Sequence, residues 1–134
     1  MGAKRKLRRL SRRPAFTRAT TLYPKRASDF RRWLGRHADR AKEVWLILYT
    51  KASHQQTVSF EDALMEALCY GWSDHRAKHV DKKRFAVLFA PVLPGRRWSA
   101  RELALAEALF GLGRMTEAGA AALTAHLRRK AARN

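Results

Sequence analysis

The chain has 134 residues, of which 29 are Lys or Arg and 11 are Asp or Glu, giving a formal net charge of +18 with histidine neutral. This length fits one domain, and a hydrophobic content of 46% is typical of a chain that folds around a core. The sequence has no run of roughly 18 apolar residues, which argues against a transmembrane helix. Its one cysteine, Cys69, excludes an internal disulfide framework. The basic start lacks the apolar stretch of a secretory signal, so we expect a cytoplasmic protein.

Most of the positive charge lies at the two ends. Residues 1–26 hold ten basic and no acidic residues, and residues 126–134 hold four basic and no acidic residues. The remaining 27–125 hold 15 basic and 11 acidic residues, a net charge of only +4. The total charge therefore describes the ends more than the body.

Like charges repel one another along a chain and keep it solvated. We therefore predict a disordered basic tail over 1–20, a single domain over 21–127 and a basic end over 128–134. The tail is suited to phosphates or an anionic lipid surface, or serves only solubility. The residues that would contact a polyanion there are Lys4, Arg5, Lys6, Arg8, Arg9, Arg12 and Arg13.

The first half of the body predicts two helices and a strand. Ser28 is a candidate N-cap for a helix over 29–41, where apolar residues recur at helical spacing. The apolar run 44–49 predicts a strand buried on both faces. A polar loop follows, and Ser59, with Asp62 three residues later, predicts the start of a second helix.

The second half predicts a hairpin and two helices. Trp72 to Val80 and Phe85 to Phe89 form the strands, with the turn between them. Ser99 and Glu102 form a capping box for a third helix, whose inner face holds Leu103, Ala106, Leu109 and Phe110. Thr116 starts a fourth helix anchored by Leu123 and Leu127. The result is an α+β fold, with a small mostly antiparallel sheet of about three strands packed with about four helices.

The candidate chemistry is sparse. His75 and His79 have a spacing that suits a shared metal ion, but zinc needs three or four ligands, and the alternative is an exposed basic strand. Cys69 lies near a helix C-terminus, where the dipole disfavours a thiolate, so we expect a small buried side chain. No catalytic motif is present, and we predict no enzyme activity, no metal and no cofactor.

Two tryptophans lie next to polar residues at the ends of elements. Trp72 precedes Ser73 and Asp74, and Trp98 lies between Arg97 and Ser99. Amphipathic rings in such places either line a ligand pocket or close the edge of a small core. The sequence leaves both alternatives open, including a small-molecule enzyme with its pocket between the two rings.

Several short motifs occur together in one order. They are Trp33-Leu34, Glu43-Val-Trp-Leu46, Leu68-Cys-Tyr-Gly-Trp-Ser-Asp74, Phe89-Ala-Pro91, Arg97-Trp-Ser99, and Gly113-Arg-Met115 with Gly119. Over about residues 22–125 this pattern resembles the YdeI/OmpD-associated (OmdA-like) family, also called bacteriocin-protection proteins. Two departures stand out: Ser73 replaces an isoleucine, and two arginines are missing after Phe89, where Arg96 and Arg97 supply charge nearby.

The resemblance implies a small bacterial α+β protein with a role in the stress response, in resistance to bacteriocins and cationic antimicrobial peptides. It implies no catalytic activity and no cofactor. The residues that match its polar motifs form the candidate surface for a ligand or a protein partner: Trp72, Asp74, Trp98, Ser99 and Arg114. The alternative function is that of a nucleic-acid or polyanion-associated protein that binds through its basic tails.

Overall fold

The computed structural model describes residues 21–133, so the tail predicted over 1–20, with its polyanion-binding candidates, lies outside the described part of the chain. In chain order the elements are β1 (Thr21–Leu22), α2 (Ala27–His37), β2 (Val44–Tyr49), the short 3-10 helix η2 (Lys51–Ser53), α3 (Phe60–Cys69), β3 (Trp72–His79), β4 (Arg84–Pro91), α4 (Ala100–Gly111) and α5 (Glu117–Arg133). This is an α+β fold, as predicted.

The strands form one mixed sheet in the order β1-β2-β4-β3. β4 pairs antiparallel with both β2 and β3, and β1 runs parallel to β2. Between Asp74 and Arg76 the register of β3 shifts against β4, which places a bulge near the start of this edge strand. The predicted hairpin is therefore present, and β1 adds a strand that the sequence analysis did not predict.

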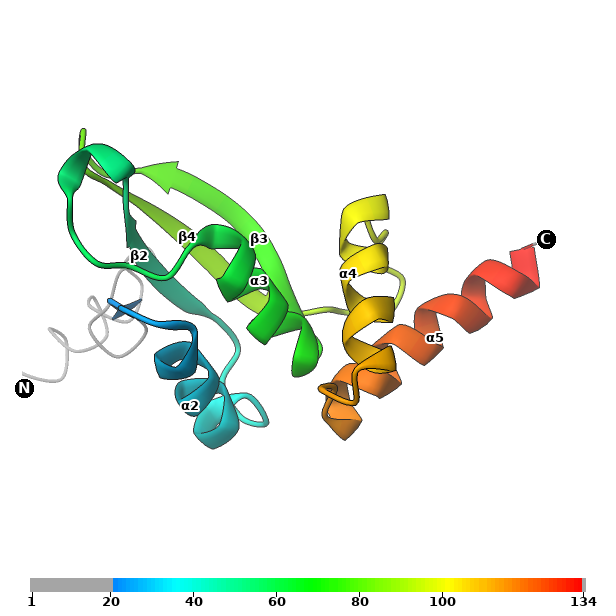
Figure 1. Ribbon diagram of the computed structural model, residues 1–134. Coiled ribbons are helices and arrows are strands. Elements are labelled where there is room, and N and C mark those ends of the chain that lie inside the picture. Colours follow the sequence, from blue (N-terminus) through cyan, green and yellow to red (C-terminus); the bar gives the residue numbers. More distant parts are fainter. Residues whose placement is uncertain (1–20, 134) are drawn as a thin grey trace, which may run out of the picture.

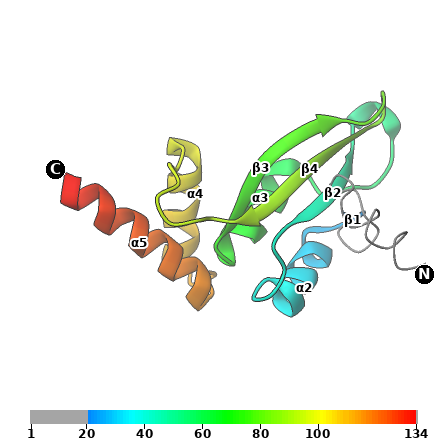
Figure 2. The ribbon, with the colours of Figure 1, turned by 180° about the vertical axis from the view of Figure 1, so that it is seen from behind.

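The sheet buries side chains on both faces. Leu46 and Val87 belong to the main core, and Trp45 and Leu88 belong to a second, smaller cluster. α3 lies in front of the sheet in Figure 1 and behind it in Figure 2, so α3 and α2 cover the main-core face. The prediction that 44–49 is buried on both faces is confirmed, because β2 alternates between the two clusters.

α4 and α5 lie beyond one end of the sheet, and α5 runs outward to the C-terminus (Figure 1). The predicted capping box is present, since the Ser99 hydroxyl accepts a hydrogen bond from the Glu102 amide at 3.0 Å and the Glu102 carboxylate accepts one from the Ser99 amide. α5 continues through Arg133, past the boundary that we expected at residue 127.

Three local predictions were wrong. α2 begins earlier than predicted, so Ser28 lies inside the helix, and the Asp29 carboxylate instead accepts hydrogen bonds from the backbone amides of Lys25 and Arg26, at 3.1 Å each. Phe110, predicted to face the core, is 55% exposed, and Leu127 is 39% exposed. Each directly follows a residue that packs against the domain, Leu109 in α4 and His126 in α5, and so lies about 100° further around its helix, off the packed face.

Candidate anion-binding cleft

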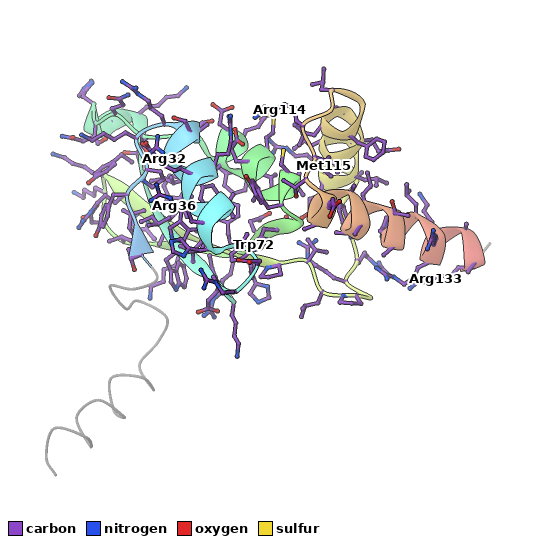
Figure 3. All side chains as sticks on the ribbon, turned by 90° about the horizontal axis from the view of Figure 1, so that it is seen from below. Arg32, Arg36, Trp72, Arg114, Met115 and Arg133 are labelled. Carbon is purple, nitrogen blue, oxygen red and sulfur yellow. The ribbon has the colours of Figure 1, made fainter. Side chains whose placement is uncertain are left out.

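The candidate residues of the resemblance do not form one open surface. Trp72 is 1% exposed, and its ring meets the edge of the Trp33 ring at a centroid distance of 5.7 Å. It fills the main core between the sheet and α2, and Figure 3 shows it in the interior of the domain. Trp72 therefore closes the core and does not line a ligand pocket. Because its ring is buried, no pocket opens between Trp72 and Trp98.

Asp74 and Ser99 take part in a network around a buried carboxylate. Glu102, on the first turn of α4, has a side chain that is only 8% exposed. Arg96 donates from Nη2 to Glu102 Oε2 at 2.9 Å and to the backbone carbonyl of Asp74 at 3.3 Å. The hydroxyl of Ser73 lies between the carboxylates of Glu102 and Asp74.

This network keeps Glu102 ionised. Burial raises the pKa of its carboxyl, but the hydrogen bonds from Arg96, Ser73 and the Ser99 amide outweigh burial, and the pKa is lowered overall. Ser73, the residue that departs from the resembled pattern, thus binds a carboxylate on another element. The network joins β3, the segment before α4 and α4 itself.

Arg114 belongs to a second cluster around a buried carboxylate. Its Nη2 donates to Glu66 on α3 at 3.1 Å, and Arg31 on α2 donates to the same carboxylate through two nitrogens, at 2.9 and 2.8 Å. The Glu66 side chain is only 4% exposed. Arg114 therefore ties the α4–α5 connection to α2 and α3 (Figure 3).

The glycines of the Gly113-to-Gly119 motif have a structural explanation. The carbonyl oxygen of Cys69, at the end of α3, accepts hydrogen bonds from the Thr116 amide at 2.8 Å and from its hydroxyl at 2.6 Å. A Cβ atom on Gly119 would lie 2.8 Å from the carbonyl carbon of Cys69 and 2.9 Å from the carbonyl oxygen of Leu68. The start of α5 therefore packs directly on the backbone of α3.

Trp98 and Ser99 border a cleft that adjoins the Glu102 network, since Arg96 and Ser99 belong to both, and that does not include the Glu66 cluster. Its volume is about 500 Å³, and its walls come from the segment before α4, the first residues of α4 and one face of α5. The lining residues are Gly95, Arg96, Arg97, Trp98, Ser99, Ala100, Leu103, His126, Arg129, Lys130 and Arg133. Among these described residues none carries a carboxylate.

The α5 wall of the cleft is a basic stripe. His126, Arg129, Lys130 and Arg133 recur at i, i+3, i+4 and i+7, which places them on one face of the helix. This spacing is visible in the sequence, whereas its proximity to Arg96 and Arg97 is not, because only the fold brings the two segments together.

Four of these cations have no opposite charge beside them in the described part of the chain. Arg96 pairs with Glu102, but Arg97, Arg129, Lys130 and Arg133 form no ion pair with a described carboxylate. Partial burial lowers the pKa of His126, and the positive charges of Arg129, Lys130 and Arg133 lower it further. The cleft is therefore electropositive at neutral pH.

Two hydrogen-bond donors on residues that line the cleft lack acceptors. The indole Nε1 of Trp98 and Nη1 of Arg96 are both buried without a hydrogen-bond partner. Trp98 as a whole is 7% exposed, and its ring rests on the ring of His126 at a centroid distance of 5.3 Å. Buried donors without acceptors are uncommon in folded proteins, and they often occur at sites that take up an ion or a ligand.

A smaller hollow of about 280 Å³ lies beside α2. It is lined by Tyr23, Trp33, Arg36 and their neighbours, and it contains Asp29, whose carboxylate lies 3.5 Å from Arg32. Because an acidic group already occupies this hollow, its positive charge is partly neutralised.

The geometry gives no support to a metal site at the two histidines or to a reactive thiol at Cys69. The described residues contain no group of three or more His, Cys, Asp or Glu side chains placed to hold a metal ion, so His75 and His79 have no third ligand there. Cys69 is buried, and burial raises the pKa of its thiol, with a further rise from the Glu66 carboxylate. Within residues 21–133 no helix is both long and apolar enough to cross a membrane.

Comparison with family models finds one match, to a domain of unknown function (DUF8412), over residues 22–122. The chain belongs to this family. No curated protein and no solved structure matches the chain. The matched range includes Arg96, Arg97 and Trp98, and it ends before His126 and the basic stripe of α5, so one wall of the cleft lies inside the DUF8412 domain and the other beyond it.

Proposed function

We propose that this protein is a non-enzymatic nucleic-acid-binding protein, which contacts the phosphate backbone without reading sequence. The observation that carries the proposal is the cleft, where Arg97, Arg129, Lys130 and Arg133 converge without a described carboxylate to neutralise them. Like charges held together by a fold cost stability. Basic residues that neutralise phosphates release the counterions condensed on the nucleic acid, and this release favours binding.

The shape of this surface favours a nucleic acid over a lipid bilayer. A helix that binds a bilayer surface exposes an apolar face beside its charges. In α5 the apolar Leu123 is buried against the domain, Leu127 is the one large apolar side chain that the described residues of this helix expose, and the basic residues of the stripe line a concave cleft. A concave basic surface suits a phosphate strand better than a flat membrane.

The test is the salt dependence of binding to a single-stranded oligonucleotide. Each phosphate neutralised on a single strand contributes a slope of about −0.7 to a plot of log K against log salt concentration. We expect Arg129→Ala, in the cleft, to reduce this slope by about that amount. Arg128→Ala is the matched control, because Arg128 lies on the same helix, is exposed and does not line the cleft.

Equal effects of the two substitutions would show that charge alone matters, and would remove the cleft from the proposal. Binding of the protein to anionic vesicles, with no binding to the oligonucleotide, would contradict a nucleic-acid ligand altogether. A further variant replaces the basic residues of the N-terminal segment with glutamine. In this variant the slope of log K against log salt concentration should be smaller. Arg129→Ala should still reduce that slope more than Arg128→Ala when each is made in this variant. The glutamines replace Lys4, Arg5, Lys6, Arg8, Arg9, Arg12 and Arg13.

Protection against bacteriocins and cationic peptides stays a prediction of the motif resemblance. Several residues of those motifs hold elements together: Trp72 fills the core, Arg114 binds Glu66, and Gly119 permits the contact between α3 and α5. A deletion strain with unchanged sensitivity to such peptides would contradict that role.

A further inference from the structure

We propose that the cleft is a site for a compact phosphate group that carries two negative charges, as a phosphate monoester at the end of a nucleic-acid strand does. This inference rests on the proposed nucleic-acid function and narrows it from the backbone as a whole to its phosphorylated terminus. An internal phosphodiester carries a single charge, whereas a terminal monoester carries close to two at neutral pH.

The convergence of separate elements supports a compact ligand. Arg97 approaches from the segment before α4, and Arg129, Lys130 and Arg133 approach from α5. Figure 3 shows Arg133 near the outer end of α5, so the basic wall extends along the last turns of the helix. A volume of about 500 Å³ is that of a small-molecule pocket, and such a pocket accommodates a terminal nucleotide.

The first turn of α4 adds partial positive charge to the same cleft. Ser99 and Ala100, which begin this helix, both line the cleft, and the capping box already provides acceptors for the amides of Ser99 and Glu102, so the amides of Ala100 and Arg101 carry this contribution. A helix N-terminus favours an anion because its first amides lack acceptors within the helix. Here the helix terminus adds to a cluster of side-chain cations.

The buried donors supply a second, independent observation. Trp98 is more than nine-tenths buried and lines the cleft, and its Nε1 has no hydrogen-bond partner, nor has Nη1 of Arg96. A monoester has three terminal oxygens and can accept several hydrogen bonds at once. We expect a small adjustment of the segment before α4 to bring these donors to the bound phosphate.

His126 is a natural reporter of such a ligand. Burial lowers its pKa, the cations Arg129, Lys130 and Arg133 on its own helix lower it further, and Arg96 and Arg97 line the same cleft from the opposite wall. A dianion beside these cations counteracts their effect, so the pKa of His126 should rise when the ligand binds.

The experiment compares strands of one sequence that carry a 5′-phosphate, a 3′-phosphate or hydroxyls at both ends. Fluorescence anisotropy at fixed salt measures their affinities for the full chain. We expect at least about tenfold tighter binding of a phosphorylated strand, the effect of a charged hydrogen bond. Arg129→Ala should abolish this preference, and Arg128→Ala should keep it. The two phosphorylated strands show which end is bound.

Equal affinity for phosphorylated and hydroxyl-ended strands would overturn this inference and leave the proposed nucleic-acid function intact. Inorganic pyrophosphate is the probe that distinguishes failure of the compact phosphate site from failure of the nucleic-acid function. If it binds in an Arg129-dependent manner while no strand binds, the compact phosphate site stands and the nucleic-acid function fails. An NMR titration of His126, assigned with His126→Gln, should show a higher pKa with pyrophosphate, and an unchanged pKa counts against the site.

Discussion

Replacement of Gly119 by alanine is the sharpest test of how the C-terminal helices are attached. A Cβ atom at this position would lie 2.8 Å from the carbonyl carbon of Cys69 and closer still to its oxygen. Carbon atoms in contact are normally about 3.5–4.0 Å apart, so α5 must move away by roughly 0.7 Å or more. The obstacle is backbone, so it cannot rotate aside as a side chain could.

The expected cost follows from these contacts. Forcing an extra methyl group into a close-packed contact costs about 1–3 kcal/mol. Moving α5 also lengthens the two hydrogen bonds from Thr116 to the Cys69 carbonyl, which contribute about 1 kcal/mol each. Alanine returns about 1 kcal/mol through its higher helix propensity. If both hydrogen bonds are lost, we expect a net loss of about 2–4 kcal/mol in the free energy of unfolding.

Gly111→Ala is the matched control. Gly111 is the last residue of α4, and a Cβ atom there would have nothing within 4 Å. Its replacement should stabilise the protein by roughly 0.5 kcal/mol. Urea denaturation followed by tryptophan fluorescence measures both variants. If Gly119→Ala is as stable as Gly111→Ala, the close contact between α5 and the end of α3 does not exist as described.

Three other groups give predictions of their own. Glu66→Ala should lower the free energy of unfolding by about 2 kcal/mol, because it removes a buried carboxylate from two half-exposed arginines; an effect equal to that of an exposed residue would contradict this. The lowered pKa of Glu102 contributes stability above its ordinary pKa, which is lost as the pH falls through the folded-state value. Urea titrations should therefore show less acid destabilisation in Glu102→Gln than in the parent. The buried Cys69 thiol, with its raised pKa, should react with DTNB slowly at pH 8 and rapidly in urea; fast reaction in buffer would refute its burial.

Local patterns were sufficient to predict much of the fold. The apolar run of β2, the serine caps at Ser59 and Ser99 and the hairpin of β3 and β4 depend on residues close in sequence. β1 could not be predicted in this way, because its two residues become a strand only through pairing with β2. Phe110 was misplaced because periodicity locates the apolar face of a helix only broadly, and the fold buries the narrower face that holds Glu102, Ala106 and Leu109.

The cleft was harder to predict than the fold. The basic stripe of α5 has a helical spacing, but its meaning depends on Arg96 and Arg97, about 30 residues earlier in the chain. The burial of Glu66 and Glu102 could not be predicted from local patterns either, because their partners come from other elements. Glu66 looks like an ordinary helical glutamate until Arg31 and Arg114 are brought to it from other elements.

α5 contacts the backbone of α3 near its first turn, so a small change of angle there moves the far end of the helix by a larger distance. At about 1.5 Å per residue, Arg133 lies roughly 21 Å along the helix axis from Gly119. If α5 tilted by about 5° about the contact at Gly119, Arg133 would move by close to 2 Å, which is most of the length of a hydrogen bond. The contact between Gly119 and the backbone of α3 therefore helps to set the width of the cleft, together with the packing of His126 on Trp98, and substitutions of Gly119 should change ligand affinity although they alter no cation.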